Sequence, residues 1–257
     1  AIYEAITCAI RTNRKPSRIL LASSLFPEEI DVLKTLAKET GIQFDFLELD
    51  PNTGRCDYNL LSTFTIEDVK QYSAFVFPQV NSLGILEDVD LLTDFCLDNR
   101  IRSIACIDPF LLGDGGLKPP VEFGRSGADF IAGDAQHLAI PPNFGGPGLG
   151  IFGCRHNDEN KSDLRNTPGR YIGQAKDLNG RDCHVMVLST REQHIRKEKA
   201  TSNVCSNQAF LATLAGSSIL SQGSKGLGMA VEIANRNQQK VIDAIELLEG
   251  IEPAFTK

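Results

Sequence analysis

Four short apolar segments alternate with helix-forming segments over the first 108 residues of the chain. The apolar segments cover residues 18–25, 42–49, 73–80 and 101–108, and each has the length of a β-strand. Strands that are apolar along their whole length and are separated by helices are typical of a parallel sheet covered on both faces. The pattern therefore predicts an α/β fold with helices on both sides of the sheet.

The segments between and after these strands complete the expected order of elements. Helical patterns cover residues 2–12, 27–41, 65–71 and 86–96, and two more helices are predicted after residue 206. Further strands are predicted at residues 128–134, 151–155 and 184–190. Glycine and proline are frequent in residues 109–127, which are predicted to form a long surface connection.

The composition excludes several classes of protein. Lysine and arginine number 26 and aspartate and glutamate 33, so the net charge is −7, and an acidic chain without a long basic run does not favour nucleic-acid binding. No apolar stretch reaches the roughly 20 residues that cross a bilayer, and no signal-peptide pattern is present. The seven cysteines are scattered without a CxxC pair, so we predict neither a metal site nor a disulfide framework. We expect a cytoplasmic protein that contacts no membrane.

Polar residues follow several of the predicted strands. They are Ser23, Ser24, Gln79, Asn81 and Asp108. Ligands of parallel sheets bind beyond the carboxyl ends of the strands, so this edge is the expected site. Two interpretations of Asp108 stay open: its carboxylate could hold a cationic ring nitrogen of a cofactor, or it could cap the turn that begins at Pro109.

A glycine-rich turn lies at residues 145–153. The segment GLGIFG has the spacing of a dinucleotide-binding motif, but it follows a proline-rich turn and leads into a predicted strand, which does not favour that function. Gly145, Gly146 and Gly148 could form an anion-binding nest with their backbone N–H groups. The alternative is a purely conformational role for these glycines.

The segment TREQHIRKEKATSNVCSNQ, residues 190–208, combines basic side chains with hydroxyl and amide side chains just before a predicted helix. Arg196, Thr201, Ser202 and Asn203 together suit the recognition of a phosphate or carboxylate group. A solvated basic loop is the alternative interpretation.

Two long segments carry a resemblance to a known family. They are LKPPVEFGRSGADFIAGDAQHLAIPPNFGGPGLGIFGCR and the REQHIRKEKATSNVC segment. The chain resembles the P-protein of the glycine cleavage system, and more narrowly its subunit 1 or the N-terminal half of the single-chain form. The resemblance implies a three-layer α/β/α sandwich, the large domain of a fold-type I pyridoxal phosphate (PLP) enzyme, with a mostly parallel seven-stranded sheet. Residues 1–250 would be a fragment of that domain, and residues 251–257 the start of a C-terminal small domain.

The resemblance also implies that one catalytic residue is missing. When AQHLAIPPNFGGPG is laid on the segment around the Schiff-base lysine of the catalytic half, Gln136 takes the place of the lysine. A carboxamide cannot form a Schiff base. Asp108 takes the place of the aspartate that pairs with the pyridine nitrogen. Lys118 lies before two prolines on an irregular stretch and is a poor substitute.

The implied function is that of a lysine-less subunit of glycine decarboxylase, which supports decarboxylation of glycine and aminomethyl transfer to the lipoyl H-protein. A lysine-bearing partner subunit or C-terminal half would bind PLP covalently, and none is expected on this chain. By analogy with fold-type I enzymes, Thr201, Ser202 and Asn203 approach the partner's site and Arg196 steers anionic groups there. Two alternatives stay open: a non-catalytic scaffold that only pairs with the catalytic half, and a self-sufficient PLP enzyme.

Overall fold

The computed structural model describes most of the chain. The described residues are 1–13, 17–157, 161, 163–169, 171–187, 200, 208–251 and 254–255. Of the predicted site residues, Arg196, Thr201, Ser202 and Asn203 lie outside these ranges.

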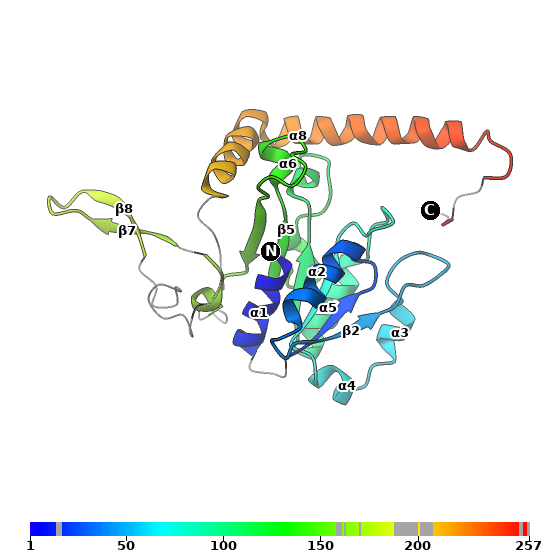
Figure 1. The fold of residues 1–257 in the computed structure, drawn as a ribbon, viewed down its shortest axis with the longest axis horizontal. Helices are drawn as coiled ribbons and strands as arrows, with labels where there is room; N and C mark the ends of the chain where they lie inside the picture. The colour runs from blue at the N-terminus through cyan, green and yellow to red at the C-terminus, as the bar shows by residue number, and fades with distance from the viewer. Residues whose placement is uncertain are drawn as a thin grey trace.

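A six-stranded sheet forms the centre of the protein (Figure 1), with the strand order β2-β1-β3-β4-β5-β6. Its strands are β1 (Arg18–Ala22), β2 (Gln43–Leu47), β3 (Ala74–Pro78), β4 (Arg102–Cys106), β5 (Phe130–Asp134) and β6 (Gly150–Cys154). The first five are parallel, and β6 runs antiparallel to β5. The α/β fold with a mostly parallel sheet is confirmed, but in the described part of the chain this sheet has six strands instead of the seven that the resemblance implies.

Helices cover both faces of this sheet. They are α1 (Ile2–Asn13), α2 (Pro27–Ala37), α3 (Tyr58–Ser62), α4 (Ile66–Lys70) and α5 (Val89–Asn99). Because side chains alternate along a strand, Leu20 and Ala22 of β1 join the core under α3, α4 and α5. Ile19 and Leu21 point to the other face and join the core under α1 and α2. The predicted three-layer sandwich is therefore present.

The last predicted strand forms a separate ribbon instead of joining the main sheet. Residues 182–186 form β8 (Asp182–Met186), which pairs antiparallel with β7 (Ile172–Lys176), a strand that the sequence analysis did not predict. A tight turn joins them: Asp177 N–H donates to the carbonyl of Arg181 at 2.9 Å, and Gly180 adopts a φ of 76°. This turn lets β8 fold back on its neighbour in sequence, and Figure 1 shows the ribbon projecting from the body.

Helix α8 (Ala209–Ile245) crosses the carboxyl edge of the sheet, where it lies over the short helix α6 (Gln136–Ala139) (Figure 1). It bends at Gly223, whose φ of 64° is not helical, so its two arms correspond to the two helices predicted after residue 206. Leu227 packs with Ala135 and Leu138 in a small apolar cluster. Gly228 passes close to the backbone of Asp114. The carboxyl edges of β4 and β5 therefore lie beneath α8.

Short turns of 3-10 helix make up part of the surface connections. They are η1 (Pro109–Leu112), η2 (Pro120–Glu122) and η3 (Asp163–Asn166). Within the described ranges, no helix combines the length and the apolar character that crossing a membrane requires.

Candidate functional site

Asp108 and His137 meet at the carboxyl ends of β4 and β5. The Asp108 Oδ1 atom accepts a hydrogen bond from the backbone N–H of Phe110 at 2.9 Å. The Nε2 atom of His137 lies 3.0 Å from the same oxygen, and both side chains are partly exposed. The capping interpretation of Asp108 is confirmed, since it caps η1. Its pairing with a cofactor nitrogen stays a prediction.

Gln136 begins α6, one residue before His137. Its backbone N–H donates to Asp134 Oδ1 at 2.9 Å. Its side-chain Nε2 donates to the carbonyl of Ile140 at 3.0 Å and to that of Pro141 at 2.9 Å. The carboxamide is therefore engaged by the loop that follows it.

The glycine-rich turn continues from this loop into β6. Gly145 has a φ of 96°, which favours glycine. The N–H of Gly146 donates to the carbonyl of Asn143 at 3.2 Å, and Asn143 Nδ2 donates to the carbonyl of Pro147 at 3.0 Å. The GLGIFG segment leads into a strand rather than a helix, as expected. The anion nest at Gly145, Gly146 and Gly148 stays a prediction.

A second polar group lies where β1 and β3 end. The strand order reverses between these strands, and open α/β sheets bind ligands at such a point. Ser24, Gln79 and Asn81 are all buried there. The Nδ2 atom of Asn81 donates to the carbonyl of Gly54 at 2.8 Å and to Glu87 Oε1 at 3.0 Å. Asn81 therefore joins two loops at this edge.

The buried carboxylate of Glu87 is the centre of this second group, and no sequence pattern indicated it. Its Oε2 atom accepts from the backbone N–H of Cys56 and from the hydroxyl of Tyr58, both at 3.0 Å. Burial, followed by the nearby Glu87, raises the pKa of the Cys56 thiol to about 12. Burial also raises the pKa of Tyr58. These donors are about thirty residues from Glu87 in sequence, so no local spacing pattern could have identified it.

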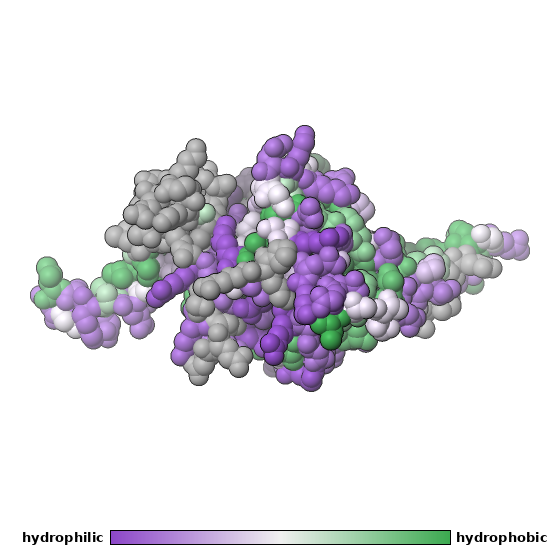
Figure 2. All heavy atoms as spheres, turned by 90° about the horizontal axis from the view of Figure 1, so that it is seen from below, coloured by the Kyte–Doolittle hydropathy of each residue, from purple (hydrophilic) through white to green (hydrophobic). Residues whose placement is uncertain are grey.

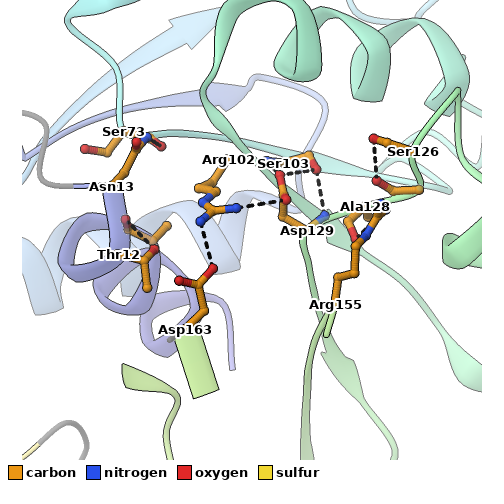
Figure 3. Close-up of polar contacts among 12 residues, drawn as sticks. Thr12, Asn13, Ser73, Arg102, Ser103, Ser126, Ala128, Asp129, Arg155 and Asp163 are labelled. Atoms are coloured by element: carbon orange, nitrogen blue, oxygen red, sulfur yellow. Dashed lines mark hydrogen bonds and ion pairs between the residues drawn. The ribbon is translucent and has the colours of Figure 1, made fainter. Parts of the chain in front are cut away.

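A third polar network lies at the opposite, amino edge of the sheet (Figure 3). Arg102, at the start of β4, donates to Asp129 Oδ1 at 3.1 Å and to Asp163 Oδ2 at 2.7 Å. Asp129 Oδ2 also accepts from the backbone N–H of Ser103 at 3.0 Å. On the face seen from this side, hydrophilic residues predominate in the middle of the described surface (Figure 2). Because ligands of parallel sheets bind at the carboxyl edge, we assign the Arg102 network a structural role.

Comparison with known protein families identifies the chain. The model of the glycine cleavage system P-protein family matches residues 1–252. The chain belongs to this family. The family resemblance carried by residues 117–155 and 191–205 is therefore confirmed.

Curated P-protein relatives are similar over almost the whole chain. The probable glycine dehydrogenase (decarboxylating) subunit 1 of Francisella philomiragia is 36% identical over 257 residues, which cover 99% of this chain and 54% of the relative. The protein of the same name from Nitrosomonas europaea is 36% identical over 255 residues, with 99% and 54% covered. These relatives are named as subunits of an enzyme, and the chain spans about half of their length.

Solved structures agree with this family. The crystal structure of an inhibitor-bound glycine decarboxylase (P-protein) of the glycine cleavage system superposes with a TM-score of 0.74 at 28% identity, covering 88% of this chain and 47% of that one. Mouse CSAD superposes with a TM-score of 0.62 at 13% identity, covering 99% of this chain and 52% of that one, which supports the fold alone.

Proposed function

We propose that this chain is the lysine-less half of a P-protein: it supports glycine decarboxylation and aminomethyl transfer to the lipoyl H-protein, while a lysine-bearing companion subunit or C-terminal half carries PLP. The observation that carries the proposal is the carboxamide of Gln136, which the family resemblance aligns with the Schiff-base lysine of the catalytic half. Membership of the P-protein family and the PLP-transferase-like fold support PLP in the assembled enzyme. The printed name "subunit 1" of the relatives supports a companion subunit.

The residues at the carboxyl edges of β4 and β5 do not fit a PLP group held covalently by this chain. Gln136 has no amine, and its Nε2 atom is bound to two backbone carbonyls. The Nζ atom of Lys118 donates to both carboxylate oxygens of Asp90 at 2.8 Å, which engages it elsewhere. We therefore propose no PLP chemistry on this chain itself. In the assembled enzyme PLP supplies an electron sink for decarboxylation.

The experiment that tests this proposal combines the full-length subunit with its companion. Exchange of glycine carboxyl carbon with labelled bicarbonate is measured for the companion alone, for this subunit alone and for the pair. We expect exchange only in the pair. Exchange by this subunit alone, with PLP fixed to it by borohydride, would favour the self-sufficient alternative.

We propose that residues 190–208 are the part of this chain that contributes to the partner's site. Thr201, Ser202 and Asn203 would approach the cofactor held by the companion, and Arg196 would attract anionic groups. Thr201→Ala is therefore expected to weaken PLP binding and slow exchange in the pair. Thr213→Ala, the same change on the exposed surface of α8, serves as the control.

The scaffold alternative is separated by the same variants. If Thr201→Ala and Asn203→Ala together leave PLP affinity and exchange unchanged while pairing is intact, the chain only pairs with the catalytic half. In that case the proposed role of the 190–208 segment is wrong, and the scaffold function remains.

A further inference from the structure

Phe144 is fully exposed at the tip of the glycine-rich turn, with 101% of its reference surface accessible. Its backbone has a φ of 50°, in the left-handed region that favours glycine. A bulky residue there costs free energy that a glycine would not, and the exposed ring gains no packing within the described chain. The turn therefore keeps an aromatic side chain at a position where glycine would fit the backbone better and where the apolar ring is exposed to water.

The turn that carries Phe144 is held in place on both sides. Gln136 Nε2 binds the carbonyls of Ile140 and Pro141, just before the turn. Asn143 Nδ2 binds the carbonyl of Pro147 across the turn at 3.0 Å. A Cβ atom at Gly146 would come within 2.8 Å of the Asn143 side chain, so the turn needs glycine there to close. These contacts hold the backbone of the turn on both sides of Phe144.

The side chain of Gln136 thus has a structural role, which differs from the Schiff-base role of the lysine that the resemblance places at this position. A carboxamide presents two N–H donors on a short stem, which matches the two carbonyls of residues 140 and 141. The position that cannot form a Schiff base instead braces the turn beyond it.

We propose that this braced turn presents Phe144 as an aromatic anchor that inserts into an apolar pocket of the companion subunit. The inference rests on the proposed function, in which this chain pairs with a companion subunit, and it places part of that contact at the carboxyl edge of the sheet. The name "subunit 1" of the relatives points to a companion chain. Phe144 lies at that edge, on the loop between β5 and β6. Aromatic residues, Phe among them, are enriched in protein interfaces, and a rigid support lowers the entropic cost of burying one.

The test measures the dissociation constant of the full-length subunit and its companion by sedimentation or fluorescence anisotropy. Phe144→Ala is expected to raise this constant at least about tenfold. Phe144→Gly is expected to weaken pairing equally, while the thermal midpoint of the isolated subunit stays the same or rises, because glycine suits the positive φ. Val121→Ala, at a 75% exposed apolar residue on η2, is the control and is expected to change nothing.

Variants at Gln136 test the bracing. Gln136→Leu removes both donors and is expected to weaken pairing by about threefold to tenfold, whereas Gln136→Lys restores donors to the two carbonyls and keeps pairing close to wild type. A structural role without an anchor would lower the thermal midpoint in Gln136→Leu and leave the dissociation constant unchanged.

The outcomes separate this inference from the proposed function. If the wild-type pair forms and catalyses exchange, but both Phe144 variants pair within twofold of wild type, the anchor is wrong and the proposed function stands. If Phe144 instead mediates self-association of this subunit, a second copy is the occupant and the inference is overturned. If the wild-type pair neither associates nor catalyses exchange, both proposals fail.

Discussion

Arg102 donates a hydrogen bond of 2.7 Å to Asp163, which joins the start of β4 to η3, 61 residues further along the chain. The side chain of Asp163 is only 6% exposed, and that of Arg102 is 23% exposed. The same guanidinium also binds Asp129, next to β5. One cation therefore holds two carboxylates and fixes the connection that leads from the sheet toward the β7–β8 ribbon.

Arg102→Leu is expected to lower the free energy of unfolding by about 3 kcal/mol, because it removes the ion pairs that Arg102 forms with Asp129 and with the buried Asp163. Urea denaturation followed by circular dichroism measures the change. Arg125→Leu is the control, because Arg125 pairs with Asp94 and Asp98 on the surface with a side chain that is 57% exposed. The free energy of unfolding of that variant is expected to fall by less than about 1 kcal/mol. Equal losses in the two variants would contradict the structural role of the Arg102 network.

Gly228→Ala is expected to disturb the docking of α8. A Cβ atom at this position would lie 2.1 Å from the carbonyl oxygen of Asp114, and backbone cannot move aside cheaply. We expect the free energy of unfolding to fall by about 1–3 kcal/mol and proteolysis within α8 to become faster. Gly216 is the matched control on the same helix, since its Cβ position is open. Gly216→Ala should be neutral or gain up to about 1 kcal/mol from helix propensity.

The buried thiols are expected to resist alkylation in the native protein. Burial raises the pKa of both Cys8 and Cys56 to about 12, so the reactive thiolate is scarce at neutral pH. Cys183, partly exposed on β8, is the internal comparison. Mass spectrometry after timed iodoacetamide treatment at about pH 8 should show Cys56 modified at least a hundredfold more slowly than Cys183. Comparable rates would show that the Glu87 region opens readily.

Asp45 is expected to contribute to acid unfolding. The Arg18 side chain, which donates to Asp45 Oδ1 at 3.0 Å, lowers the pKa of this carboxyl, and Tyr72 adds to the effect. Because the folded-state pKa lies below the unfolded-state value, the stabilisation is complete above the unfolded pKa of about 4 and is lost as pH falls through the folded pKa.

Asp45→Asn should therefore be less stable than the wild type at neutral pH and should lose less stability on acidification. Urea midpoints measured from about pH 7 to pH 3 give this comparison. An acid dependence equal to that of the wild type would contradict the contribution of Asp45.

The site was only partly predictable from the sequence. Asp108 could be placed at a strand end because the apolar run before it is uninterrupted, and its cap on Phe110 follows from local turn chemistry. Its contact with His137 depends on β5 lying beside β4, which no local spacing specifies. Glu87 was missed for the same reason. The match of Gln136 with the lysine position is implied by the family resemblance. Its hydrogen bonds to Ile140 and Pro141 are seen only in the structure.

The parallel core follows from the sequence alone, because the runs in β1, β3 and β4 are apolar on both sides and can be stable only between two helical layers. The positions of the remaining segments depend on long-range packing. The β8 segment pairs with β7 through a local turn rather than joining the main sheet, and α8 reaches the carboxyl edge through close backbone approach at Gly228. Such choices depend on contacts between residues far apart in sequence, whose free energies no local pattern records.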